Sequence, residues 1–168
     1  INVRRSYLNL VRDKGQAYQI SQALDSISHW LAVHPDDGEV RSNYLNFVRD
    51  KANGWYIAQV LDSTRAWLES HPDNMHVRSN YLNFIKEKGD YQQIQQALES
   101  TLVWLEYHDD DVEVRRTYLN LVKEKGSTDQ IAHAIENMRT WLKSHDDNAE
   151  VIAAYLNLVK EKGDTQYV

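Results

Sequence analysis

Apolar side chains recur at intervals of three and four residues along the chain, and this spacing predicts helices. A first stripe runs through residues 77–88 and is carried by Val77, Tyr81, Leu82, Phe84 and Ile85. A second stripe follows after Gly89 and is carried by Ile94, Ala97, Leu98, Thr101 and Leu105. Each spacing places its apolar side chains on one face of a helix. The pair of stripes therefore predicts a hairpin of two helices.

The same pattern recurs every 37 residues, so the chain is an internal repeat. One column consists of Val3, Val40, Val77, Val114 and Val151, and another of Tyr7, Tyr44, Tyr81, Tyr118 and Tyr155. The Trp column consists of Trp30, Trp67, Trp104 and Trp141. We predict one array over residues 1–168 with about nine helices and units 1–36, 37–73, 74–110, 111–147 and 148–168, the last unit being partial. Because one hairpin cannot bury its own stripe, neighbouring hairpins must stack on these columns. Trp55 lies outside the columns, and we expect it to be exposed.

The ends of the first helices carry recognisable signals. Three Asp–Glu pairs have the spacing of a capping box, namely Asp36 with Glu39, Asp110 with Glu113 and Asp147 with Glu150. Four glycines follow the first helices and are expected to adopt left-handed backbone: Gly15, Gly89, Gly126 and Gly163. In the second unit, Asn53 or Gly54 is expected to take this role. Residues 163–168 are expected to begin a further helix.

The repeat resembles the tetratricopeptide family over all 168 residues. The likeness is carried by Pro72-Asp73-Asn74 through Lys88-Gly89 and by Gln96-Ala97-Leu98. It implies a right-handed superhelical solenoid of helical hairpins, whose first helices line a concave face that binds protein segments. The family's unit is about 34 residues long, so three more are accommodated here, around the turn between the helices or the start of the second helix. A leucine also replaces the small residue usual in the first helix: Leu8, Leu45, Leu82, Leu119 and Leu156.

Polar residues recur on the side of each first helix opposite the apolar stripe. The Asn column consists of Asn9, Asn46, Asn83, Asn120 and Asn157. Cations follow one turn later at Arg12, Arg49, Lys86, Lys123 and Lys160, and Arg5 and Arg116 lie four residues before an Asn. An amide donates and accepts, so this row can pair with an extended peptide, and the cations favour an acidic one. The alternative is that each Asn bonds a neighbouring helix or loop and holds the stack in register.

The resemblance adds one site at the start of the array. Arg5, Asn9 and Asn43 are similar to three members of the carboxylate clamp of chaperone adaptors. His76 and Asn80 stand where that clamp has two basic residues, so the likeness implies only a partial clamp. The candidate ligand-binding residues are Arg5, Asn9, Arg12, Asn43, Asn46, Arg49, Asn83, Lys86, Arg116, Asn120, Lys123 and Asn157.

Two further columns favour structural roles. The Arg column consists of Arg4, Arg41, Arg78 and Arg115, which we expect to pair with acidic residues of the adjacent loop or helix. The His column consists of His34, His71, His108 and His145, at the ends of the second helices. There an imidazole can face the terminal carbonyl groups of its helix.

Composition and missing motifs narrow the function. The net charge of −6 disfavours nucleic acid, including the RNA that the similar pentatricopeptide repeats bind. The absence of cysteine excludes disulfides and thiolate sites and fits the cytoplasm. No apolar run approaches the roughly 20 residues that cross a membrane. There is no Gly-rich phosphate loop, and Asp109–Asp111 lacks the glycine of a calcium loop. We therefore predict no catalytic, cofactor or metal site.

The sequence predicts a protein–protein interaction scaffold that binds a peptide or protein segment, and not an enzyme. The chain begins at Ile1 and is interpreted as an excerpt of a larger protein. The alternative hypothesis is a self-assembling or sensor arm of a larger signalling protein, reminiscent of the sensor regions of large bacterial signalling NTPases. Units this alike have compatible ends, so end-to-end self-association is possible in principle. RNA binding is a third and disfavoured hypothesis.

Overall fold

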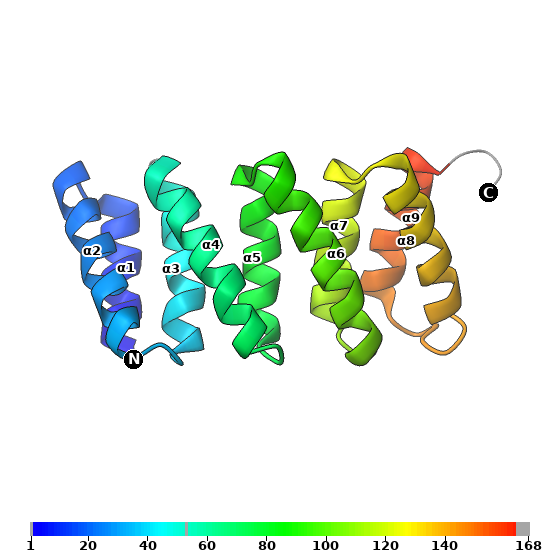
Figure 1. Ribbon diagram of the computed structural model, residues 1–168, viewed down its shortest axis with the longest axis horizontal. Coiled ribbons are helices and arrows are strands. Elements are labelled where there is room, and N and C mark those ends of the chain that lie inside the picture. Colours follow the sequence, from blue (N-terminus) through cyan, green and yellow to red (C-terminus); the bar gives the residue numbers. More distant parts are fainter. Residues whose placement is uncertain (1, 53, 164–168) are drawn as a thin grey trace. The chain divides into compact units, whose positions relative to one another are not determined.

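A computed structural model describes residues 2–52 and 54–163, with side chains from Ser6 onward. These residues form nine helices and no strand, which confirms the predicted all-helical fold (Figure 1). The helices are α1 (Asn2–Lys14), α2 (Ala17–Val33), α3 (Gly38–Lys51), α4 (Gly54–Ser70), α5 (Met75–Lys88), α6 (Tyr91–Tyr107), α7 (Val112–Lys125), α8 (Thr128–Trp141) and α9 (Ala149–Lys162). Odd-numbered helices are the first helices of the repeat and even-numbered ones are the second helices. Only two residues separate each first helix from the second helix after it, so the extra length of the unit does not lie in that turn.

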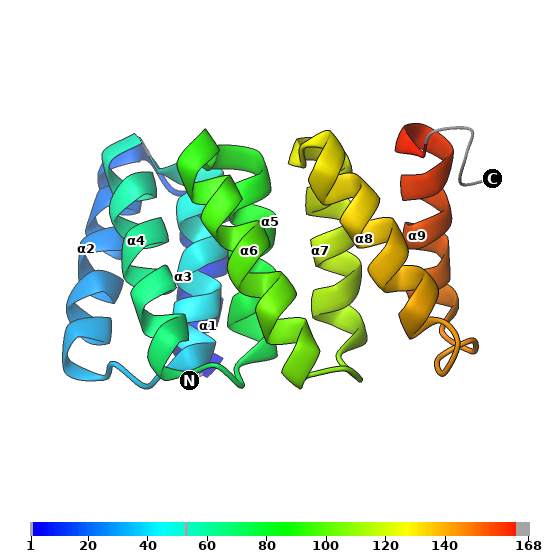
Figure 2. The ribbon, with the colours of Figure 1, turned by 45° about the vertical axis from the view of Figure 1, so that its right-hand side comes forward.

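The chain divides into two compact units, residues 1–88 and 89–168. In the first unit, α3 packs against α1, α2, α4 and α5. In the second unit, α7 packs against α6, α8 and α9. Within each unit the first helices form one layer and the second helices another (Figures 1 and 2). The single array over all 168 residues and its right-handed superhelix remain predictions.

The repeating columns form the core, as predicted. Copies of the Tyr column in α3, α5 and α7 are buried, as are Trp67, Trp104 and Trp141. Some copies on the end helices lack this cover: Tyr7 of the Tyr column is 47% exposed, and Leu156, which aligns with the buried Leu45, Leu82 and Leu119, is 57% exposed. Trp55, outside the columns, is 65% exposed, as expected. None of the helices in the described ranges is both long and apolar enough to span a membrane.

The predicted capping boxes at the first helices are wrong by one residue. The N-cap of α3 is Asp37, whose carboxylate accepts the Val40 amide at 3.0 Å. The same bond recurs once in each later repeat, with the caps Asn74, Asp111 and Asn148. Glu39 sits at the second helical position, too early to reach back to the cap. The carboxylate of Asp36 instead faces the next hairpin, where its Oδ1 lies 3.0 Å from Nε2 of His71.

The predicted left-handed glycines are also wrong. No described residue has a positive φ, and Gly126 ends α7 in extended backbone with φ −71° and ψ 150°. Its Cβ, if added, would lie 2.6 Å from the carbonyl oxygen of Val122, to which its amide donates. Glycine at this place therefore does not provide left-handed backbone, although a side chain on Gly126 would require the Val122 carbonyl group to shift. In the second hairpin Ala52 occupies the equivalent position, and Gly54 is the first residue of α4. Asn53 lies outside the described residues. Residues 164–168, where a further helix is expected to begin, also lie outside them.

Candidate functional site

The Asn column occupies one position on each first helix. Asn46, Asn83 and Asn120 are half-buried in α3, α5 and α7, and Asn9 and Asn157 are exposed on the end helices. Within the described part of the chain, none of these five amides forms a hydrogen bond, and none of their polar atoms is sealed from solvent. If the Asn column held the stacked helices in register, its amides would form such hydrogen bonds. The unpaired amides can instead donate to and accept from a ligand without breaking a bond in the protein.

The cations beside the Asn column are held by carboxylates. Arg49 lies 3.2 Å from Asp50 and 3.7 Å from Glu87, which is on the next first helix. Lys123 on α7 and Glu161 on α9 repeat this pairing at 3.2 Å. These pairs link neighbouring first helices, and their charge is already compensated inside each unit.

The other candidate cations are placed less uniformly. Arg116 lies 3.4 Å from Glu150, and Arg12 pairs with its chain neighbour Asp13 at 3.3 Å. Lys86 is half-buried on α5. The side chain of Arg5 lies outside what the structure describes.

A polar hollow of about 510 Å³ opens between α3 and α5. Its walls are Gly38, Glu39, Ser42, Asn43, Asn74, His76 and Asn80. Asn43 donates to the carbonyl oxygen of Glu39 at 2.9 Å, and the amide of Asn80 donates to the hydroxyl of Ser42. Of the predicted clamp residues, the hollow contains Asn43 together with the two non-basic replacements, His76 and Asn80. It offers hydrogen bonds to a ligand and one carboxylate, but no lysine or arginine.

The Trp and His columns form a link between hairpins. The indole nitrogen of Trp67 donates to the carbonyl oxygen of Pro35 at 2.7 Å, and its ring stacks on His71 with centroids 4.0 Å apart. Nδ1 of His71 lies 3.1 Å from the carbonyl oxygen of Trp67, as predicted for a histidine at a helix end. Nε2 then contacts Asp36 of the preceding loop. The column is therefore structural in these hairpins.

The second unit repeats this link with Trp141 and His145. Trp141 donates to the carbonyl oxygen of Asp109 at 2.8 Å, and Nε2 of His145 lies 3.2 Å from Asp110. The hydrogen bond with the Trp141 carbonyl, followed by the bond and charge of Asp110, raises the pKa of His145 above its ordinary 6.5. The protonated imidazole is thus favoured in the folded chain.

The Arg column divides into two cases. Arg115 pairs with Asp109 at 3.1 Å, which confirms the prediction for this copy. For Arg41 the prediction is wrong, since it forms no ion pair or hydrogen bond with any described residue. The reason is local, because Pro35 stands six residues before Arg41 where Asp109 stands six before Arg115. The side chain of Arg4 lies outside the described residues.

Two kinds of contact were not predicted, although the spacing of their residues is visible in the sequence. Capping boxes begin the second helices, with Asp90 and Gln93 at α6 and Ser127 and Gln130 at α8. The Asp–His contacts join residues 35 positions apart, as in Asp36 and His71, and so follow from aligning the units.

No group of three or more His, Cys, Asp or Glu residues in the described chain is arranged to hold a metal ion. Comparisons with family models, with curated proteins and with solved structures give no match to this chain. The chemistry of its candidate sites therefore rests on the residues themselves.

Proposed function

We propose that this chain is a binding scaffold of the tetratricopeptide type, which holds a peptide or protein segment along its first helices. The observation that carries the proposal is that the half-buried amides of Asn46 and Asn83 in the first unit, and of Asn120 in the second, have no partner in the described chain. A repeated amide that both donates and accepts suits the repeating N–H and C=O groups of an extended segment. The hollow between α3 and α5 adds further polar groups beside the row.

The proposed ligand is an extended protein segment and not nucleic acid. An acidic side chain has to compete with Glu87 for Arg49 and with Glu161 for Lys123. The amides, and not the cations, therefore carry most of the recognition in this proposal. No catalytic group, cofactor or membrane contact enters it, and the absence of cysteine suits a cytoplasmic protein.

A selection experiment tests the proposal. Random peptides displayed on phage are selected on the wild-type chain and then measured against a variant with Asn46→Ala, Asn83→Ala and Asn120→Ala. Because these amides make no bond within the described chain, the variant should keep the wild-type thermal melt while losing the selected peptides.

A matched control removes three amides from the second helices, through Gln22→Ala, Gln92→Ala and Gln96→Ala, all at exposed positions. This control should bind the peptides as the wild type does. If the Asn variant melts much earlier, the Asn column holds the stack. If it melts normally and still binds, the peptides use another surface and the proposal is wrong.

The alternative is self-association through the end helices of the chain. Tyr7 and Leu10 on α1 and Leu156 on α9 are exposed, whereas their copies on the inner first helices are buried. A second copy of the chain could cover these columns in the way that neighbouring hairpins cover the inner ones. A sensor arm of a larger signalling protein would use the same surfaces.

Light scattering against protein concentration separates the two candidates. A mass that grows with concentration in the wild type and not in a Leu10→Lys, Leu156→Lys variant supports assembly. A constant monomer mass supports the binding scaffold.

A further inference from the structure

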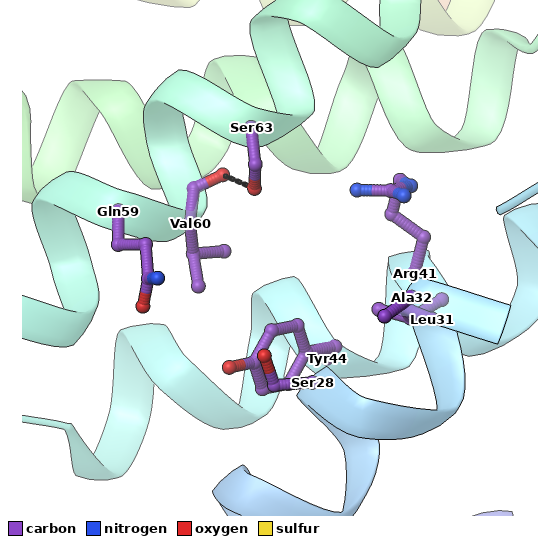
Figure 3. A pocket seen from close by; sticks show the side chains of 8 residues that line it. All are labelled: Ser28, Leu31, Ala32, Arg41, Tyr44, Gln59, Val60 and Ser63. Atoms are coloured by element: carbon purple, nitrogen blue, oxygen red, sulfur yellow. Dashed lines mark hydrogen bonds between the residues drawn. The ribbon is translucent and has the colours of Figure 1, made fainter.

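An open pocket lies between the second helices α2 and α4, with α3 beneath it (Figure 3). Its volume is about 200 Å³. This is several times the roughly 30 Å³ that one water molecule occupies in the liquid. The lining residues are Ser28, Leu31, Ala32, Arg41, Tyr44, Gln59, Val60 and Ser63. All belong to the first unit, and none belongs to the Asn column.

Arg41 is the only charged residue among the residues lining this pocket. It is 8% exposed, and its guanidinium carbon lies 5.1 Å from the centre of the Trp67 ring. It has no ion pair and no hydrogen bond with another described residue. Its Nε is buried without an acceptor, as is the Nε of Arg115, whereas its two terminal nitrogens are not sealed from solvent. Figure 3 shows its guanidinium group on the same side of the pocket as Ser63, with Tyr44 and Ser28 below. A guanidinium group this deeply placed and without an acidic partner is well suited to pair with an anion that enters through the pocket.

The second unit contains the same site with its anion built in. Arg115 is 2% exposed and donates to Asp109 twice, to the carbonyl oxygen at 3.2 Å and to the carboxylate at 3.1 Å. Nη1 of Arg115 also lies 3.4 Å from the amide oxygen of Asn137. At the corresponding places around Arg41 stand Pro35 and Ser63, which supply neither the carboxylate nor the amide oxygen. The carbonyl oxygen of Pro35 accepts from the indole of Trp67.

The remaining lining suits a carboxylate with a short apolar stem. Leu31, Ala32 and Val60 provide apolar contact, and Gln59 can donate a hydrogen bond. Burial raises the pKa of Tyr44 to about 12, so its hydroxyl stays protonated at neutral pH and can donate as well. The hydroxyl of Ser63 donates to the carbonyl oxygen of Val60 at 3.2 Å.

We propose that the pocket above Arg41 binds a carboxylate group, which takes the place that the Asp109 side chain occupies beside Arg115. The carboxylate comes from a small aliphatic acid or from an Asp or Glu side chain of a partner protein. In either case the bond is a charge-assisted pair with the guanidinium group. The site is separate from the proposed peptide-binding row on the first helices.

Butyrate and its neutral isostere butyramide are the first probes, added to the isotope-labelled full chain. The side-chain Nε–H resonance of Arg41 should shift saturably with butyrate and not with butyramide. Acetylated and amidated hexapeptides that differ only in one Glu or Gln form the second arm. Preferential binding of the Glu peptide over butyrate assigns the carboxylate to a protein, and preferential binding of butyrate assigns it to a free acid.

Two variants keep the test decisive. Arg41→Met removes the cation and should weaken butyrate binding, followed in both variants by titration calorimetry, by roughly tenfold or more. Pro35→Asp combined with Ser63→Asn rebuilds the Arg115 surroundings, so it should fold, melt at a higher temperature and also lose butyrate. Equal shifts from butyramide, or butyrate binding that survives in both variants, would overturn the proposal.

Discussion

At the residue scale, single polar groups in this chain have their roles set by neighbours in the adjacent repeat. His71 and His145 each stack on a tryptophan four residues earlier and contact an aspartate of the preceding loop. Arg41 and Arg115 differ in the same way, through what the preceding loop supplies. The repeat therefore fixes where a side chain lies, and the neighbouring loop decides whether it has a partner.

The raised pKa of His145 predicts that the stability of the chain depends on pH. Since the folded chain favours the protonated imidazole, this group stabilises the fold below the ordinary pKa of 6.5. The contribution is lost as the pH rises through the higher folded value. The urea midpoint should therefore decrease as the pH is raised from below 6.5 through the higher folded pKa of His145.

The control for this prediction is His145→Gln, measured over the same pH range. The difference in midpoint between wild type and variant should shrink as the pH rises. A difference that stays constant, or that grows with pH, would show that protonation of His145 does not stabilise the fold.

At the element scale, the position within the array decides how much a residue of one column matters. Leu45 and Leu156 occupy the same place in the repeat, but Leu45 is fully buried on α3 and Leu156 is 57% exposed on α9. Burial of a leucine is a principal source of stability, so the two copies should differ strongly in their effect.

Leu45→Ala should lower the free energy of unfolding by about 2–5 kcal/mol, because it leaves a cavity in the first unit. Leu156→Ala should change it by less than about 0.5 kcal/mol, because the side chain is largely in water already. Urea unfolding followed by circular dichroism measures both. Similar losses from the two variants would mean that the columns do not form the core as described.

The start of α7 provides a second test at this scale. Asp111 accepts the Val114 amide at 2.8 Å and is the cap, whereas Asp110 contacts His145. Asp111→Ala should cost about 1 kcal/mol of stability at any pH where the carboxylate is ionised. Asp110→Ala should instead flatten the pH dependence that depends on His145. If the two variants exchanged these effects, the capping box expected from the sequence would be right after all.

At the scale of the whole molecule, the two compact units are the natural level of description. The helix α3 packs against four other helices that all belong to residues 1–88, so the contacts that cover it lie within that segment. A repeat array is stabilised mainly by contacts between neighbouring repeats.

A fragment of residues 1–88 should therefore be helical and unfold cooperatively on its own. A fragment of residues 1–51 should not, because it ends before α4 and α5 can cover α3. Thermal melts by circular dichroism compare the two. A non-cooperative melt of the longer fragment would show that the first unit needs the rest of the chain to fold.

The sequence predicted the helices well because a 37-residue period fixes all of them at once. It missed the caps because two consecutive Asx residues, such as Asp36 and Asp37, both have plausible spacing, and only the backbone shows which of them reaches the amide. It missed the glycine geometry because glycine adopts extended and left-handed backbone equally readily, so its presence does not show which of the two is used. The unpaired Arg41 could have been noticed by aligning Pro35 with Asp109, but its pocket depends on how α2 and α4 pack.

The central claim is that the unpaired amides of the Asn column bind an extended protein segment. The most direct measurement follows the side-chain N–H₂ resonances of Asn46, Asn83 and Asn120 while a selected peptide is added to the isotope-labelled chain. These three resonances should move together and saturate at one peptide concentration, while those of Gln92 and Gln96 stay in place. Unmoved asparagine resonances in the presence of a bound peptide would contradict the claim.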